Sequence, residues 1–192
     1  MHTVELKHAY RLLNHGPTVL VGSHHAGRAN VMAAAWAMPL DFDTPKIAVV
    51  IDKSTLTREL IDASGVLSLC VPTVAMKDQV MAAGGLSGKE HTDKLARCQI
   101  STQPAPLTGV PLVDGCTAQL ECRVLPATAH VAGPHDLILA EVVGAWADER
   151  VFSQGRWHFE DAAPELRSLH HVAGGHFYAI GEAVQSLPAA NA

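Results

Sequence analysis

The chain has 192 residues, of which 48% are hydrophobic and 17% are charged, and its formal net charge is −5. That length fits one domain, here residues 1–192, and the apolar content is enough to build a core. The basic residues are scattered, which argues against a nucleic-acid partner. No apolar run reaches the roughly 20 residues of a membrane span, and the charged start of the chain does not resemble a signal peptide. We therefore expect a cytoplasmic protein with no membrane partner.

The first half of the chain alternates short apolar runs with turn and cap signals. Strands are predicted at Pro17–Gly22, Ala29–Ala37, Lys46–Ile51 and Val66–Val71. The segment SHHAGR indicates a hairpin between the first two strands. Ser54 or Thr55 can cap a helix that begins near Leu56 and ends at Ser64-Gly65. Two more helices are predicted, at Val74–Ala83 and Glu90–Arg97.

The second half contains more strands after a proline-rich, irregular connection at Gln103–Pro111. Strands are predicted at Thr117–Val124, Ala127–Val131, Asp136–Ala147, Trp157–Phe159 and His176–Ile180. Many short strands with inserted helices favour an antiparallel barrel with helical decoration. A Rossmann unit is disfavoured because there is no GxGxxG and no regular alternation of strands with long helices.

The first segment that could carry chemistry is residues 53–58, KSTLTR, where a strand end leads into a helix. Free backbone N–H groups and the positive end of the helix dipole suit a phosphate at such a junction. Three hydroxyls and two cations within six residues strengthen this interpretation. An ordinary Ser/Thr cap with solvated Lys and Arg is the alternative.

The second candidate segment is residues 30–36, NVMAAAW. A strand edge lined with alanines lets a planar ligand approach the backbone closely, and Asn30 can both donate and accept hydrogen bonds. The alternative is a tightly packed barrel strand with one core tryptophan.

Taken in order along the chain, these segments resemble the flavin reductase-like FMN-binding split barrels, and within that group the flavoredoxins. Further matching segments are Pro39, PKIAV at 45–49, KSTLTRELI at 53–61, GVLSLCVP at 65–72, Ser87-Gly88 with Asp93-Lys94, GPHD at 133–136 and LHHVAGGHFYAIGE at 169–182. Each motif is short, but the resemblance covers nearly the whole chain with consistent order and spacing.

The resemblance implies a mainly β fold, an antiparallel, Greek-key-like split β-barrel with inserted short helices. It also implies a homodimer with one FMN per subunit, bound at the dimer interface. The implied cofactor contacts are Lys53, Ser54, Thr55 and Thr57 at the phosphate; Asn30, Trp36 and the backbone of Met32, Ala33, Ala34 and Ala35 at the isoalloxazine; Lys94 near the ring or the phosphate; His135 near the ring, from the same or the partner subunit; and His170 closing the pocket.

The implied activity is that of an NAD(P)H-dependent flavin reductase, with NADH or NADPH as a transient donor. No catalytic acid–base pair is expected, because the flavin carries the hydride chemistry and the protein supplies position and electrostatics. The alternative within the family is a flavoredoxin-like carrier that holds FMN tightly and exchanges electrons with a redox partner protein. The sequence does not decide between the two.

A non-redox, metal- or ligand-binding barrel is the alternative from another class, because the chain has 12 histidines. His170, His171 and His176 could donate ligands, but adjacent residues on a strand point to opposite faces. The four cysteines form no CxxC pair and are expected to be free thiols. We therefore expect no metal.

Overall fold

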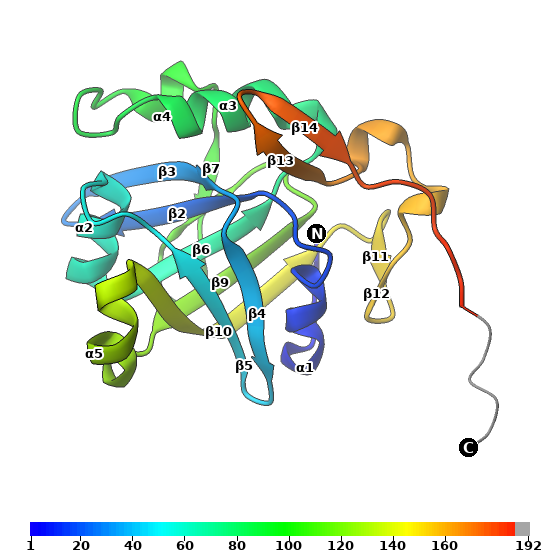
Figure 1. Ribbon diagram of the computed structural model, residues 1–192, viewed down its shortest axis with the longest axis horizontal. Helices are drawn as coiled ribbons and strands as arrows, with labels where there is room; N and C mark the ends of the chain where they lie inside the picture. Colours follow the sequence, from blue (N-terminus) through cyan, green and yellow to red (C-terminus); the bar gives the residue numbers. More distant parts are fainter. Residues whose placement is uncertain (187–192) are drawn as a thin grey trace.

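The computed structural model describes residues 1–186, apart from the side chains at 130 and 131, so residues 187–192 of the predicted domain lie outside it. Its main element is an antiparallel sheet in the order β3-β2-β6-β9-β10-β5-β4, with β1 beside β10. Its strands are β1 (His2–Thr3), β2 (Val19–His25), β3 (Arg28–Ala34), β4 (Ala37–Phe42), β5 (Pro45–Val50), β6 (Val66–Val71), β9 (Ala118–Val124) and β10 (Leu137–Ala147). The sheet curls around its own core, and β3 and β4, neighbours in the chain, stand at its two ends (Figure 1). The predicted mainly β split barrel is confirmed.

Shorter elements surround this barrel. Three two-stranded ribbons pair β7 (Thr102–Pro104) with β8 (Pro111–Val113), β11 (Phe152–Ser153) with β12 (Arg156–Trp157), and β13 (Leu169–Ala173) with β14 (His176–Ala179). The helices are α1 (Leu6–Ala9), α2 (Leu56–Ser64), α3 (Lys77–Gly85), α4 (Lys94–Arg97) and α5 (Ala129–Ala132). Short 3-10 turns lie at Tyr10–Leu12, Val74–Met76, Pro126–Thr128, Gly133–His135, Phe159–Asp161 and Pro164–Leu166. Within residues 1–186, no helix combines the length and the apolar character needed to cross a membrane.

The central strands are buried on both faces, which explains their continuous apolar runs. Val21, Leu69 and Leu120 point into the barrel and are fully buried. Leu20 and Cys70 point outward and pack in a second cluster beneath α3. This outer layer holds α3 and the β13–β14 ribbon over one end of the barrel, beside β3 (Figure 1). The candidate site lies under that cover.

Most sequence predictions of the elements are confirmed, with the bounds of β6 and α2 matching closely. Of the strand predicted at Trp157–Phe159, only Trp157 lies in a strand, and Phe159 begins a 3-10 turn. The strand predicted at Ala127–Val131 is wrong. This segment begins as a 3-10 turn at Pro126–Thr128 and continues as α5, because Pro126 presets a helical first turn and the surrounding alanines favour helix. Strands β4 and β13 were not predicted, and the irregular connection contains the ends of β7 and β8.

Candidate functional site

A hydrogen-bonded turn between β5 and α2 fixes where the helix starts. The Asp52 carboxylate accepts the N–H of Ser54 at 2.7 Å, and the Thr55 hydroxyl donates to the Asp52 carbonyl at 2.8 Å. Hydrogen bonds from the Ser54 hydroxyl and N–H hold the pKa of Asp52 below its usual range. Thr55 is the N-cap and accepts the N–H of Arg58 at 3.2 Å. The other N–H groups in this first turn have no intrahelical acceptor, and the helix dipole favours an anion beside them.

The two cations of this segment turn away from the helix start. The Lys53 ammonium lies 3.3 Å from a carboxylate oxygen of Asp136. The buried Arg58 guanidinium contacts the Asp62 carboxylate at 2.9 Å and donates to the Ile51 carbonyl at 3.0 Å. Lys53 and Arg58 therefore brace the turn and the back of α2.

A buried hydrogen bond joins β3 to α2. Asn30 Nδ2 donates to Thr57 Oγ1 at 2.7 Å, and both residues are buried. The loop after α3 approaches this pair so closely that a Cβ on Gly88 would lie 2.6 Å from Asn30 Oδ1 and 2.8 Å from Leu56 Cδ2. Arg28 holds the loop by donating to the Gly88 carbonyl at 2.6 Å. Glycine is therefore required at this position of the loop.

Lys94, the first residue of α4, brings positive charge to the same place. Only 5% of its surface is exposed. Within residues 1–186 it takes part in no ion pair. Burial lowers the pKa of Lys94, because the charged form is poorly solvated. A bound anion would stabilise the charged ammonium.

These elements enclose a polar pocket with a volume of about 250 Å³. Its walls are β3, the start of α2, the segment from the end of α3 to Gly88, and Lys94. The lining residues are Asn30, Met32, Ser54, Thr55, Leu56, Thr57, Ala83, Gly84, Gly85, Leu86, Ser87, Gly88 and Lys94.

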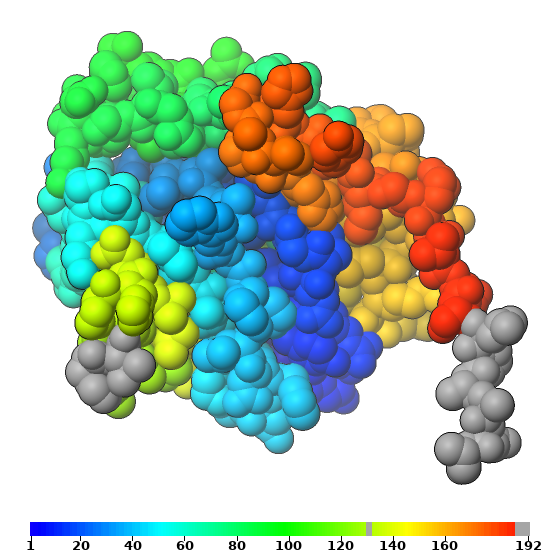
Figure 2. Space-filling model, in the orientation of Figure 1, coloured from blue at the N-terminus to red at the C-terminus, as the bar shows by residue number. Residues whose placement is uncertain are grey.

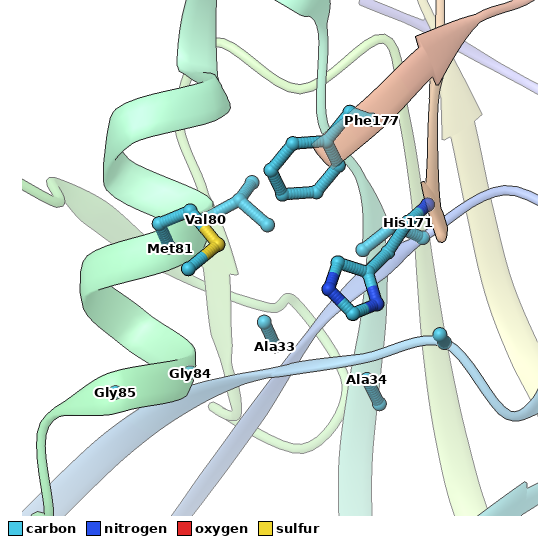
Figure 3. Close-up of a pocket in the computed structure, with 10 residues that line it drawn as sticks. Ala33, Ala34, Val80, Met81, Gly84, Gly85, His171 and Phe177 are labelled. Carbon is cyan, nitrogen blue, oxygen red and sulfur yellow. The ribbon is translucent and has the colours of Figure 1, made fainter. Parts of the chain in front are cut away.

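An apolar pocket of about 280 Å³ adjoins the polar pocket at Gly84 and Gly85, which line both. Figure 3 shows Val80 and Met81 entering from α3, with His171 and Phe177 entering from the β13–β14 ribbon. Ala33 and Ala34 of β3 form the floor, and Thr18 and Ala35 complete the lining. In Figure 2 the surface is hollowed between the green segment of α3 and α4 and the blue segment of β3 and β4. A long flat ligand with an anionic end fits these two joined pockets.

His171 is the ionisable side chain among the residues that line the apolar pocket. Its backbone N–H donates to the Thr18 hydroxyl at 2.8 Å, which fixes the strand against β2. Its ring meets Phe177 edge-on, with centroids 5.3 Å apart. Imidazole can donate or accept one hydrogen bond here, while the rest of the pocket offers apolar surface.

The structure brings most of the predicted site residues together. Six line the polar pocket, namely Asn30, Met32, Ser54, Thr55, Thr57 and Lys94. Ala33, Ala34 and Ala35 line the apolar pocket. Lys53, Trp36, His135 and His170 line neither pocket. Their cofactor roles stay predictions, as do those of the residues that the pockets do bring together.

Trp36 and His135 lie on the surface beside the site. Trp36 is 73% exposed and borders a groove of about 230 Å³ with Met38, Val50 and Leu137. His135 is exposed in a 3-10 turn. Neither residue packs into the core of its own chain, in contrast to the core tryptophan that the sequence left open as an alternative.

His170 points to the opposite face of β13 from His171. Its Nδ1 lies 3.1 Å from the Gly16 carbonyl, and its ring packs against His15 at 5.8 Å. The alternation of side chains along a strand accounts for this, because only one of two adjacent histidines can face the pocket. His171 therefore occupies the place that the sequence assigned to His170.

Several lining residues were not singled out from the sequence. Gly84, Gly85 and Gly88 belong to the segment GGLSGKE at 84–90, and none of the three was predicted as a cofactor contact. Phe177 and Met81 carry no polar signal, and only the packing of the ribbon on α3 brings them together. Leaving aside the side chains at 130 and 131 and the residues beyond 186, no three His, Cys, Asp or Glu side chains gather closely enough to hold a metal ion.

Comparison with known proteins identifies the family. The family described as "Flavin reductase like domain" matches residues 11–184, so the chain belongs to the flavin reductase-like family. A solved FMN-binding domain of a flavin reductases-like enzyme from Shewanella baltica OS155 is 47% identical, covers 96% of both chains and superposes with a TM-score of 0.92. The Escherichia coli (strain K12) protein YddH is 46% identical over 184 residues, which cover 94% of this chain and 95% of YddH.

Two further relatives have names that describe a function. The flavoredoxin of Desulfovibrio vulgaris (Miyazaki F) is 25% identical, covers 89% of this chain and 90% of that chain, and has a TM-score of 0.74. RutF of Variovorax paradoxus (strain S110), named FMN reductase (NADH), is 29% identical over 83% of this chain and 86% of its own. The resemblance predicted from the sequence, to flavin reductase-like barrels including flavoredoxins, is confirmed.

Proposed function

We propose that this chain is a flavoprotein oxidoreductase that binds FMN and works as an NAD(P)H-dependent flavin reductase. The observation that carries the proposal is the buried Lys94 ammonium, which has no ion-pair partner within residues 1–186 and faces the start of α2 beside an apolar pocket. A bound anion would stabilise the charged form of Lys94 against this burial. FMN supplies a phosphate at one end and a flat ring at the other.

The residues fit this cofactor. Ser54, Thr55 and Lys94 would hold the phosphate together with the free N–H groups of α2. Thr57 has its hydroxyl bonded to Asn30, so it positions that amide at the pocket wall. Ala33, Ala34 and Ala35 would lie along the isoalloxazine, because their small side chains let the ring approach the β3 backbone.

The bound flavin would accept a hydride and pass on electrons, and the chain would position it and exclude water. The NADH donor is supported by RutF, whose name states that activity, and NADPH stays open. The flavoredoxin relative supports the second candidate, an electron carrier that keeps its FMN and serves a redox partner protein. No lining residue is needed as a general acid for hydride transfer.

One set of measurements tests both candidates. The absorbance spectrum of the purified chain, before and after added FMN, shows whether flavin binds. Oxidation of NADH or NADPH with catalytic or added FMN then identifies a reductase, whereas bound flavin that neither nucleotide reduces identifies a carrier. A chain that purifies without flavin and takes up no added FMN contradicts the proposal.

We also propose that the chain works as a homodimer. Strand β4 and the residue before it expose Trp36 and Met38, which share one face because side chains alternate along a strand. Trp36 is 73% and Met38 55% exposed, and the two form an apolar stripe along one groove, which is unusual for large apolar residues. A second copy would cover this stripe and bring Trp36 and His135 into an interface beside the cofactor.

The remaining expectations concern where the protein works and how it is divided. All four cysteines are free and buried, which is compatible with the reducing cytoplasm. The match over residues 11–184 supports one flavin reductase-like domain across the chain.

A further inference from the structure

Three sulfur atoms meet in the buried layer beneath α3. Cys70 lies on β6, Cys116 lies just before β9, and Met76 ends the 3-10 turn at Val74–Met76. Their exposed fractions are 0%, 4% and 6%, in the order Cys70, Cys116 and Met76, and all three pack in the cluster outside the barrel. None of the three lines the polar or the apolar pocket, so this sulfur cluster is separate from the proposed flavin site.

The three sulfur atoms are linked through Cys116. Its sulfur lies 4.0 Å from the Met76 sulfur, and its thiol is hydrogen-bonded to the Cys70 thiol. A metal–sulfur bond of about 2.3 Å sets the sulfur ligands of a trigonal site about 4.0 Å apart. The spacing of Cys116 and Met76 therefore matches that of two ligands on one ion.

Cys70 is the thiol of this cluster that is best placed to carry a negative charge. The Val113 N–H donates to its sulfur at 3.4 Å, and the Ser68 hydroxyl lies 4.0 Å away. Burial raises the pKa of the Cys70 thiol, but the hydrogen bonds of its neighbours, the Cys116 thiol first, outweigh burial and hold that pKa below its ordinary value. Burial and the bond to Cys70 raise the pKa of the Cys116 thiol. The proton between the two sulfurs therefore belongs to Cys116.

We propose that Cys70, Cys116 and Met76 form a binding site for Cu(I), which would take the place of the proton between the two thiols. A monovalent ion replaces that proton without changing the net charge, which matters because an unbalanced charge is costly in an apolar layer. Thiolate and thioether sulfurs are ligands that select Cu(I), whereas zinc takes cysteine, histidine and carboxylate ligands. We expected no metal from the cysteine and histidine spacings, and the thioether of Met76 is the ligand that those spacings do not include.

Competition for Cu(I) between the reduced chain and bicinchoninate, a coloured Cu(I) chelator, tests the site under nitrogen. We expect the wild type to remove a single Cu(I) per chain from the chelator. Cys70→Ser and Cys116→Ser each remove a ligand, so binding should weaken at least about a hundredfold, because losing a residue that only hydrogen-bonds a metal ligand already costs about 10–100-fold. Met76→Leu keeps the core volume and removes the thioether, so binding should weaken about tenfold.

Cys98→Ser is the matched control, because Cys98 is a buried thiol in the same cluster that lies at the end of α4. It should leave the Cu(I) affinity unchanged. Urea unfolding with and without Cu(I) then separates a folded site from loose thiols, since an ion bound by the fold raises the urea midpoint and an ion bound by the unfolded chain lowers it. A raised midpoint that Cys116→Ser abolishes and Cys98→Ser retains supports the proposal.

Three results would overturn the copper site. The wild type takes no Cu(I) from the chelator, Cu(I) lowers the urea midpoint, or Cys98→Ser weakens binding as much as Cys116→Ser does. Circular dichroism checks that each variant is folded, and if the serine variants are not, an unchanged affinity in Met76→Leu overturns the site by itself. The three sulfurs are then ordinary core packing, and the proposed flavin site is unaffected because none of them lines its pockets.

Discussion

The polar pocket and the apolar pocket differ in how completely a single chain encloses them. We call them the polar side and the apolar side of the site. The polar side is closed by its own groups, with Asn30 bonded to Thr57, Gly88 packed on both strand and helix, and Lys94 buried. The apolar side continues onto an uncovered surface, where Trp36 is 73% exposed. If FMN binds as proposed, one chain would be enough to fix its phosphate, whereas the surroundings of its ring would need a second surface.

The largest effect is expected from placing a charge in the exposed stripe. Met38→Arg would enclose unpaired cations between two copies, and such a burial costs about 3–5 kcal/mol when no partner is present. We expect a dimer to become a monomer, measured as molar mass by light scattering. Leu107→Arg is the matched control, because Leu107 is a 59% exposed apolar residue outside the stripe. A Met38→Arg protein with unchanged mass, or a monomeric wild type, contradicts the covered stripe.

The second largest effect is expected at His15, which packs with His170 on the side of β13 that faces away from the pocket. His15 packs against His170, Trp157 and Phe159, and burial lowers its pKa to about 4, with a further contribution from the charge of His170. Above pH 6.5, His15 is neutral in the folded and the unfolded chain. As the pH falls from 6.5 to 4, only the unfolded chain takes up the proton, so the folded state loses up to about 3 kcal/mol.

Urea unfolding at pH 7 and pH 4.5 measures this loss. His15→Phe keeps an aromatic ring in the cluster, so we expect a smaller loss of stability on acidification than in the wild type. His25→Gln alters an exposed histidine of the β2–β3 hairpin and should leave the loss unchanged. An identical pH dependence in His15→Phe and wild type would show that another group causes it.

Local signals predicted the polar side better than the apolar side. The KSTLT segment joins a cap, hydroxyls and a strand–helix junction within a few residues, and the structure confirms that junction. Which of Lys53 and Lys94 lines the pocket could not be predicted, because the pairing of Lys53 with Asp136 joins residues that are far apart in the sequence.

The apolar side depends on contacts between segments that are far apart in sequence. Met81 and Phe177 are ordinary core residues by type, and they meet only because the β13–β14 ribbon folds over α3. The choice between His170 and His171 needed the register of β13, and that strand was not predicted. The local pattern of one segment contains neither piece of information.

The third prediction concerns Lys94, the buried cation of the polar side. Lys94→Met removes a charged hydrogen-bond donor from the phosphate, so we expect FMN to bind about 1.5–3 kcal/mol more weakly in calorimetric titrations. The flavin-free protein should instead become more stable in urea, because burial of the charge penalises the folded state. Lys77→Met, at an exposed lysine of α3, is the control and should change neither quantity appreciably. A loss of both affinity and stability would indicate a structural role for Lys94.

The smallest effect tests how closely the loop after α3 must approach the Asn30–Thr57 pair. A Cβ at position 88 would stand 2.6 Å from Asn30 Oδ1, so Gly88→Ala has to displace the loop and its carbonyl bond to Arg28. Overpacking of this kind costs about 1–3 kcal/mol, and we expect FMN affinity to fall about tenfold. Gly181→Ala is the matched control, because nothing lies within 4 Å of its added Cβ and it lines neither pocket. If both alanine variants bind FMN as tightly as the wild type, the loop is free to move aside. A single chain would then close the polar side less tightly than the packing at Gly88 indicates.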